Sequence, residues 1–467
     1  MSIARAEKEN KKENQAEKEK PQNVMGTQPI NRLLLSMSIP MMLSMMVQAL
    51  YNIVDSIFVA KIGENALNAV TLAFPVQNIM IGIGVGTGVG INALLSKSLG
   101  ERNFERVNKA GSNGFFLVWI SAGIFAVAGA FLSEWYFRIQ TDIEEIITMG
   151  KDYLFVVCVF SVAIFTQVTL ERLLASTGKT FYAMVSQLSG AAVNIILDPI
   201  MIFGLLGFPA LGVLGAAIAT VIGQTVACAV GFYLNQSRNQ EISLSFKGFR
   251  PDGWIIKNIY AVGLSSILMQ AAGSIMFYGI NQILLSFTAT ATAVFGVFFR
   301  LQSFLFMPVF GLNNAMVPII AFNYGARRRS RITKTIRLSM LYAGGIMIFG
   351  LLLFQLFPDK MLLLFSAGEN MLTLGIPAMR IVSLIFLFAG FCIIGLSVFQ
   401  AMGSGTESLI IAVCRQLVIL LPAAWLLSFL GDINAVWWAF PIAEVVSLTL
   451  CVIFLKRLYI RKIKPLP

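Results

Sequence analysis

Three carboxylates lie inside long apolar stretches of the sequence, at Asp55, Asp198 and Glu444. If these stretches cross a bilayer, each ionised side chain costs about 2.5–3.5 kcal/mol to insert, so acids kept there commonly bind a proton, a cation or a counter-ion. The chain contains no His, which removes His-based nucleophile pairs, proton relays and HExxH metal sites. Any proton handling must therefore depend on Asp or Glu.

Asp55 and Asp198 are expected at similar depths in the membrane. If the helix that carries Asp198 begins near residue 181, this side chain lies about 26 Å along it, at 1.5 Å per residue. Asp55 lies near the outer end of its own stretch, and Asn194 precedes Asp198 by four residues, on the same helix face. Two carboxylates in a low-dielectric environment tend to hold a proton or a cation. We therefore expect an ion-coupling site at Asp55, Asn194 and Asp198; the alternative is that Asp198, before Pro199, only stabilises a helix end.

Glu444 and Arg300 both lie roughly ten residues from the outer ends of their predicted helices. Because an α-helix rises about 1.5 Å per residue, the two side chains are expected at a similar depth. Opposite charges at similar depth predict an ion pair between them. We favour a structural role for this pair; a second ion site is the alternative.

Two further patterns resemble nucleotide-binding motifs. Glycines at every second position from Gly82 to Gly90 follow no strand, so they predict a small-residue stripe for close helix packing and not a dinucleotide site. Ser176 to Thr180 echoes a phosphate-binding loop but has Leu173 where that loop needs Gly. The five Cys form no CxxC pair, so neither a zinc site nor a disulfide framework is expected. No cofactor is predicted.

The composition is that of a membrane protein. Of 467 residues, 57% are apolar and 12% are charged, whereas soluble domains carry roughly 25% charged residues. This excludes an ordinary soluble enzyme, a disordered chain and a disulfide-stapled domain. A membrane helix needs about 20 apolar residues, and twelve stretches qualify: 33–60, 67–95, 110–132, 148–170, 181–204, 212–235, 256–286, 290–320, 335–357, 374–400, 407–430 and 434–456.

The net charge of +12 is explained by topology. With twelve spans, both termini and the even-numbered loops share one side, which carries 28 Lys and Arg and 11 Asp and Glu; the other side carries 4 and 9. The positive-inside rule places the basic side, and therefore both termini, in the cytoplasm. Nucleic-acid binding is not expected. Residues 1–29 contain mixed Lys and Glu with no signal-peptide apolar region and are predicted to be a charged tail.

The chain repeats itself at a shift of about 225 residues. Gly100 then aligns with Gly325, and three basic residues after each glycine also coincide. Each half holds six spans, so the halves have the same orientation and are related by an axis along the membrane normal. We predict an all-α membrane protein of twelve helices in two parallel six-helix lobes. The predicted divisions are the tail 1–29, the N-lobe 30–235, a cytoplasmic linker 236–255, the C-lobe 256–457 and a basic tail 458–467.

Several motifs together resemble the multidrug and toxic compound extrusion (MATE) family, over about residues 30–457. The motifs are Ser38-Ile39-Pro40, Asn52 to Val59 around Asp55, Gly63, Asn194 with Leu197 to Ile200, Gly212 to Thr220, and Trp438 to Glu444.

The resemblance implies two lobes in a V that export amphipathic, often cationic drugs in exchange for inward H⁺ or Na⁺. In the DinF-like branch an Asp of the first helix and an Asn and an Asp of the fifth form the ion site, which matches Asp55, Asn194 and Asp198. The bending proline of the first helix matches Pro40. The NorM-like branch adds acids on the seventh and tenth helices, which this sequence lacks, so no C-lobe cation site is expected.

We therefore expect a cation-coupled multidrug antiporter of the cell membrane that is monomeric, with small organic molecules and the lipid bilayer as its partners and no cofactor besides the coupling ion. One alternative, a lipid-linked saccharide flippase, would need a more cationic cavity than Arg300, Arg380 and Arg415 supply. The other, a membrane enzyme, would need paired catalytic Asp, and Asp198 lacks a GxGD-type context.

Overall fold

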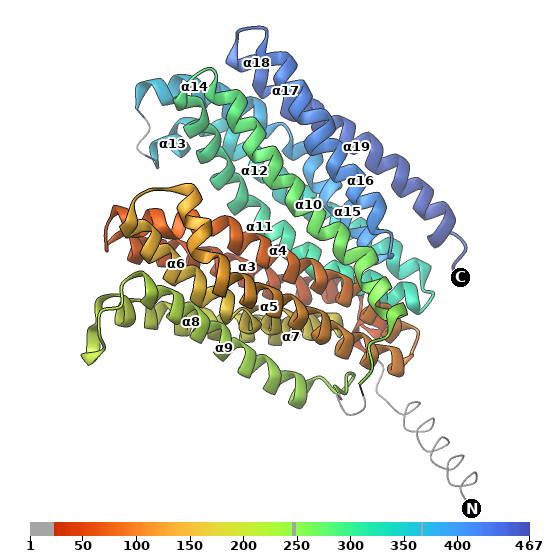
Figure 1. Ribbon diagram of the computed structural model, residues 1–467. Coiled ribbons are helices and arrows are strands. Elements are labelled where there is room, and N and C mark those ends of the chain that lie inside the picture. The colour runs from red at the N-terminus through yellow and green to blue at the C-terminus, as the bar shows by residue number, and fades with distance from the viewer. Residues whose placement is uncertain (1–22, 245–248, 366–367) are drawn as a thin grey trace, which may run out of the picture.

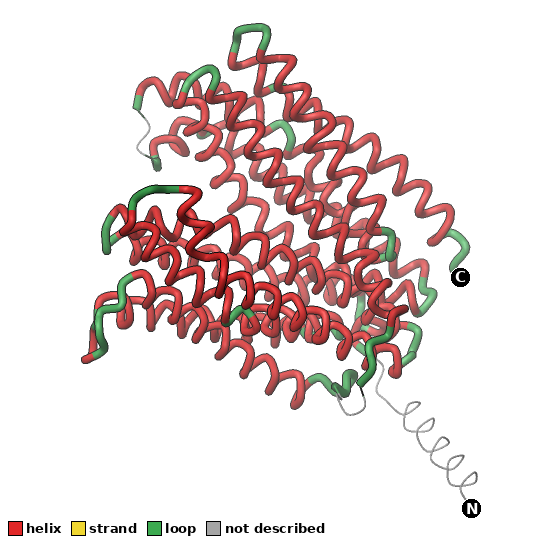
Figure 2. The backbone as a smooth tube through the Cα atoms, viewed as in Figure 1, coloured by secondary structure: helices red, strands yellow, loops and turns green. Residues whose placement is uncertain are grey.

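The computed structural model describes residues 23–244, 249–365 and 368–467, and the regular elements within these ranges are helices (Figure 2). The first half contains α2 (Val24–Thr27), α3 (Ile30–Ala60), α4 (Glu64–Gly100), α5 (Phe104–Gln140), α6 (Glu144–Val159), α7 (Val162–Ser176), α8 (Thr180–Phe203), η1 (Leu205–Gly207) and α9 (Val213–Arg238). The second half contains α10 (Gly253–Leu285), α11 (Ala289–Gly325), α12 (Arg329–Leu356), α13 (Pro358–Leu363), α14 (Glu369–Ser383), α15 (Phe386–Ala401), α16 (Gly405–Val413), η2 (Cys414–Leu420), α17 (Leu421–Ser428), α18 (Ile433–Trp437), α19 (Ala439–Leu458) and η3 (Tyr459–Ile463).

These helices confirm the twelve predicted spans. Ten helices are long and apolar enough to cross a membrane. Two further spans are bent pairs, α6 with α7 at 45° and α14 with α15 at 48°. The bent pairs are the fourth span of each half, so even this irregularity follows the internal repeat.

The two halves form two bundles (Figure 1). The helices α3 to α9 make the N-lobe, and α10 to α19 make the C-lobe. The lobes diverge at the end that carries α13 and α14, and they lie close together at the opposite end.

Two glycines bring the lobes into backbone contact at their converging ends. A Cβ atom built on Gly100 would lie 1.9 Å from the carbonyl oxygen of Phe322, and one built on Gly325 would lie 2.1 Å from that of Lys97. Gly100 and Gly325, like Lys97 and Phe322, are 225 residues apart. Reciprocal contacts of this kind are the signature of a two-fold relation, here between the two lobes of one chain.

The predicted glycine stripe of α4 packs against α10, and the distances along it show that the two helices move apart. A Cβ on Gly90 would lie 2.1 Å from the carbonyl oxygen of Ile259, and one on Gly86 would lie 3.0 Å from that of Gly263. At Gly82 the nearest atom belongs to the flexible Gln270 side chain, at 3.6 Å. The space between α4 and α10 therefore widens with distance from Gly100.

Both predicted tails have structured portions. Residues 1–22 lie outside the described residues, but α2 has a fully buried Met25, so the solvated tail does not extend to residue 29. At the other end Lys462 donates to the Met402 carbonyl at 3.1 Å, and Ile463 is buried. The helices α9 and α10 also extend into the predicted linker, to Arg238 and from Gly253. Sequence periodicity missed these segments because short helices and docked turns carry no membrane-length apolar pattern.

We predict that Gly100→Ala destabilises the protein by about 1–3 kcal/mol, the usual cost of overpacking, because its Cβ would overlap the Phe322 carbonyl. Unfolding by SDS titration in mixed micelles measures the change. The matched control is Gly123→Ala, since Gly123 lies in helix α5 with no atom near its Cβ position. That control should be neutral or stabilising, as expected from helix propensity; equal effects of the two variants would contradict the contact.

Candidate functional site

The structure brings Asp55 and Asp198 together inside the N-lobe. The helices α3 and α8 pack along one another, and each acid lies five residues before the C-terminal end of its helix, at Ala60 and Phe203. Their carboxyl groups lie close enough to interact electrostatically. Asp198 is fully buried, whereas Asp55 keeps part of its surface exposed. The predicted common depth of the two acids is confirmed.

Asn194 holds the buried end of this pair. Its Nδ2 donates to Asp198 Oδ1 at 3.2 Å and also lies 3.3 Å from the Thr220 hydroxyl, which α9 supplies. The Tyr51 hydroxyl lies 3.5 Å from the same Thr220 oxygen. Tyr51 precedes Asp55 by four residues, as Asn194 precedes Asp198, so two i,i+4 pairs face each other across α3 and α8.

Three oxygens at this site are buried and have no hydrogen-bond partner among the described residues: Asp55 Oδ1, Asn194 Oδ1 and Asp198 Oδ2. A buried acceptor left unpaired costs about 1–3 kcal/mol, and native structures rarely leave such atoms empty without a functional reason. A hard cation such as Na⁺, which prefers oxygen ligands, would bind to oxygens of this kind, and a proton on one carboxyl would turn that carboxyl into a donor for a neighbouring acceptor. The donor set therefore fits both ions that the sequence left open.

A second layer of polar groups surrounds the pair. Gln77 on α4 donates to the Tyr153 hydroxyl of α6 at 2.8 Å. Tyr153 is buried and close enough to Asp55 and Asp198 to interact electrostatically with both. Sequence reasoning missed Tyr51, Gln77, Tyr153 and Thr220 because uncharged residues in apolar helices do not stand out; only the four-residue spacing of Tyr51 from Asp55 could have signalled one of them.

The equivalent place in the C-lobe is apolar. Ile280 aligns with Asp55 and is fully buried. Leu421 aligns with Asp198 at a shift of 223, and its side chain lies 2.7 Å from the position of a Cβ on Gly279. Close apolar packing of α10 against α17 thus replaces the acid pair, so the fold itself does not require the two carboxylates.

The predicted ion pair between Arg300 and Glu444 is wrong. Glu444 is buried and pairs with Arg415 at 3.4 Å, whereas Arg300 is exposed. Similar depth gives the position of two residues along their helices. It does not give the direction in which each side chain points around the helix axis. Arg415 lies on η2, which packs directly against α19, the helix of Glu444.

Two charges inside the N-lobe were also missed, because the fourth span was predicted to end at residue 170. The helix α7 continues to Ser176 and places Glu171 and Arg172 within the bundle. Glu171 accepts a hydrogen bond from Gln167 at 2.9 Å. Arg172 donates to Asn314 of α11 at 2.9 Å, so this guanidinium connects the two lobes.

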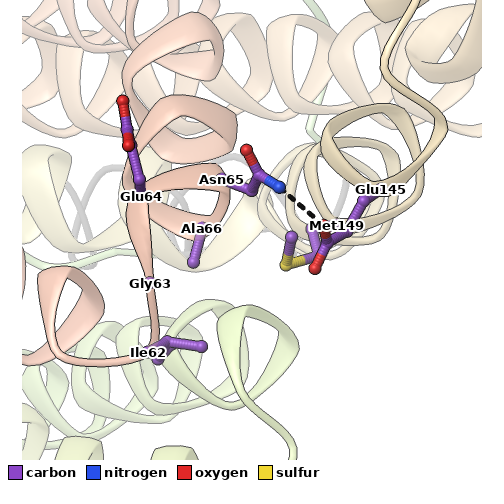
Figure 3. A pocket seen from close by; sticks show the side chains of 7 residues that line it. All are labelled: Ile62, Gly63, Glu64, Asn65, Ala66, Glu145 and Met149. Carbon is purple, nitrogen blue, oxygen red and sulfur yellow. Dashed lines mark hydrogen bonds between the residues drawn. The ribbon is translucent and has the colours of Figure 1, made fainter.

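A small surface pocket of about 240 Å³ lies at the outer ends of α4 and α6 (Figure 3). Its lining residues are Ile62, Gly63, Glu64, Asn65, Ala66, Glu145 and Met149. Asn65 donates to Glu145 across it at 2.5 Å. None of these residues belongs to the acid pair, so this pocket is a separate surface feature.

Comparison with known proteins agrees with this arrangement. A family model described as MatE matches residues 40–200 and 265–426. The two matches begin 225 residues apart, which confirms the internal repeat. Among curated relatives, the multidrug export protein MepA of Staphylococcus haemolyticus is 25% identical over 89% of this chain and 91% of its own length. An FAD transporter of Shewanella oneidensis is 26% identical over 92% and 95%.

Solved structures of transporters are also similar to this chain. A transporter of the MOP superfamily from Pyrococcus furiosus superposes with a TM-score of 0.86 at 25% identity, over 93% of this chain and 97% of its own. An outward-facing multidrug resistance MATE family transporter gives the same values. The DinF-like branch stays a prediction. The twelve-helix fold, the duplicated family match and these relatives together establish that the chain belongs to the MatE family of multidrug and toxic compound extrusion proteins, which are membrane transporters and not enzymes.

Proposed function

We propose that this protein is a secondary active antiporter of the cell membrane that exports amphipathic organic molecules in exchange for H⁺ or Na⁺. The observation that carries the proposal is the buried pair of Asp55 and Asp198, with its three unpartnered oxygens. The chain acts as a monomer, has both termini in the cytoplasm, and uses no cofactor besides the coupling ion.

The ion is loaded through Asp55. Asp198 and Asn194 are fully enclosed and form the fixed base of the site, whereas Asp55 retains an exposed surface on α3. When both carboxyls are ionised they repel each other, and a proton or Na⁺ between them removes this repulsion. Loading therefore draws the outer part of α3 toward α8.

Movement of α3 can reach the lobe interface through Pro40. The helix is continuous across Pro40 in this structure, but a proline lacks the N–H needed for the helical hydrogen bond and so provides a point of weakness. Two residues later, the backbone of Met42 lies 2.7 Å from the position of a Cβ on Gly311 of α11. A bend at Pro40 would shift this contact between the lobes and release the cargo outward.

The orientation of the V follows from charge. The basic loops lie at the converging ends of the lobes, and the positive-inside rule assigns that side to the cytoplasm. The diverging ends then face outward, so this conformation is the outward-facing state of an alternating-access cycle.

The names of the relatives support two cargo classes. MepA is a multidrug export protein, which favours amphipathic, often cationic drugs as cargo. The FAD transporter supports a second candidate, a phosphate-bearing flavin nucleotide. Arg172, which contacts Asn314 between the lobes, is the group that would bind such a phosphate. Neither relative favours the flippase alternative.

Asp55→Asn is expected to abolish gradient-driven efflux of a cationic dye from intact cells, since the amide can neither bind a proton nor attract Na⁺. Asp198→Asn should give the same loss. We expect at least a tenfold decrease, the change that about 1.4 kcal/mol produces.

The control for both variants is Asp142→Asn, which removes an exposed acid in the loop between α5 and α6. It should leave efflux unchanged. Full gradient-dependent efflux by Asp55→Asn, at equal membrane abundance, would refute the role of the pair.

The coupling ion can be identified in proteoliposomes. If H⁺ is the ion, an imposed pH gradient drives dye transport without Na⁺, and each transported dye molecule is accompanied by proton movement that a pH indicator detects. If Na⁺ is the ion, transport at constant pH requires a Na⁺ gradient. Asp55→Asn should remove the response to whichever gradient is active, and a response that persists in this variant would show that coupling occurs elsewhere.

The second cargo class is tested by competition. If a flavin nucleotide is carried, FAD should inhibit dye efflux by the unaltered protein, and Arg172→Gln should lose that inhibition while it still exports the dye. Arg250→Gln removes an exposed arginine as the control. Absence of FAD inhibition in the unaltered protein would exclude this cargo class without affecting the drug-export proposal.

A further inference from the structure

The short segment of residues 23–28, which we call the clasp, lies between the two lobes at their cytoplasmic ends. It includes α2 and directly precedes α3, the first membrane helix. Met25 and Gly26 are buried. A segment predicted to be part of a solvated tail therefore has a buried centre, whereas Val24 and Thr27 are exposed.

One end of the clasp is fixed to the N-lobe. The Asn23 amide donates to the Thr177 carbonyl at 2.9 Å and to Glu241 Oε1 at 3.0 Å. Glu241 is held in turn by Lys179, at 2.5 Å. The clasp thus begins on the turn between α7 and α8.

The middle and end of the clasp are fixed to the C-lobe. Arg331 of α12 donates to the carbonyls of Met25 and Gln28 at 2.9 and 2.8 Å. Asn323 of α11 donates to the Met25 carbonyl at 3.1 Å, and Arg328 donates to the Gly26 carbonyl. Hydrogen bonds from charged donors are stronger than those between neutral groups, so the guanidinium of Arg331 is the main polar attachment.

Apolar contacts of the clasp also connect the N-lobe and the C-lobe. The Met25 side chain is fully buried and belongs to the same hydrophobic cluster as Phe322 of α11. Its Cγ lies 3.2 Å from the position of a Cβ on Gly178, which is in the turn of the N-lobe. Gly178 has φ +87°, a conformation that favours glycine. Met25 therefore fills a space between a turn of one lobe and a helix of the other.

The clasp is too short to remain bound to both lobes when they separate. Two residues separate the N-lobe attachment at Asn23 from the C-lobe attachment at Met25, and two residues of chain span at most about 7 Å. When the cytoplasmic ends part, the contact between Gly100 and Phe322 must open, and the clasp cannot remain bound to both sides.

The equivalent segment of the other half forms a different set of contacts. Residues 249–252 precede α10 as the clasp precedes α3, and the backbone amide of Asp252 donates to Asn113 Oδ1 at 2.9 Å. Arg106, which aligns with Arg331, pairs with Glu101 and lies over the Trp254 ring instead of binding backbone carbonyls. Among the described residues of these two segments, the paired arginine-to-carbonyl attachment is found at residues 23–28.

We propose that the clasp is a cytoplasmic lock: it stabilises the outward-facing state and must leave the C-lobe before the cytoplasmic side opens. This inference rests on the alternating-access function proposed above and adds the element that sets the balance between its two states. Asn23, Met25 and Arg331 form the lock, and Arg331 is its releasable contact because the segment is covalently continuous with α3 of the N-lobe.

The test uses distances between spin labels in the full-length protein. Glu105→Cys and Ser330→Cys place labels at exposed positions 225 residues apart, at the cytoplasmic starts of α5 and α12, in a background without native cysteines. Arg331→Ala should increase the long-distance, cytoplasm-open population at least about fivefold, as expected for the loss of one hydrogen bond of about 1 kcal/mol. Arg331→Lys, which keeps one donor, should give a smaller increase.

The matched control is Arg337→Ala, because Arg337 is exposed on the same helix. It should leave the distances unchanged. If Arg331→Ala and Arg337→Ala give the same distance distribution, the lock is refuted. If Arg331→Ala does not fold, Asn23→Ala releases the other attachment and must produce the same shift, or the proposal fails. Because no gradient or cargo is needed, the result stands even if coupled efflux is disproved.

Discussion

The contact between backbone atoms at Gly100 and Gly325 is the constraint on which the arrangement of the two lobes depends. Because neither glycine has a side chain, α4 and α11 meet at the pseudo-two-fold axis with carbonyl oxygens where Cβ atoms would otherwise lie. The contact lies at the C-terminal ends of both helices, so in this conformation the lobes diverge toward the other ends. The glycine stripe of α4 shows that divergence as a loosening of contacts from Gly90 to Gly82. The fold thus concentrates close packing at one end and leaves the other end free for cargo.

The proposed ion site is far from this contact along the chain and would act on it through a helix. Asp55 is 25 residues from Ile30 along α3, or roughly 37 Å at 1.5 Å per residue. The helix α3 packs against α8 within its own lobe and against α11 of the other lobe, so it contacts the partner lobe and also carries one acid of the pair. Its cytoplasmic end continues into the clasp. One helix therefore connects the proposed ion site, Pro40, the lobe interface and the proposed lock, so the proposed coupling needs no longer chain of side-chain contacts.

Much of this could be predicted from the sequence, because membrane insertion imposes strong rules on it. Apolar runs predicted all twelve spans. The high free-energy cost of a charge inside the membrane indicated Asp55 and Asp198 as functional candidates. Three features could not be predicted, each for a physical reason. The pairing of Glu444 with Arg415 depends on helix rotation, which depth does not report. The enclosure of Asp55 and Asp198 by Tyr51, Tyr153 and Thr220 depends on neutral residues that resemble ordinary packing residues. The docking of residues 23–28 depends on backbone carbonyls, which carry no sequence signal.

The two halves share a fold but differ in the residues that the proposed mechanism uses. Ile280 and Leu421 pack where the N-lobe carries acids, so in the proposed mechanism ion binding changes the internal repulsion of the N-lobe. Arg331 binds the clasp, whereas its counterpart Arg106 pairs with Glu101, so only the C-lobe holds the lock. Ion binding then acts on the outer part of α3 in one lobe, and the lock acts on its cytoplasmic end from the other. With the two controls at opposite ends of the same helix, the outward-facing and inward-facing states can be biased independently, which a perfectly symmetric pair of lobes could not achieve.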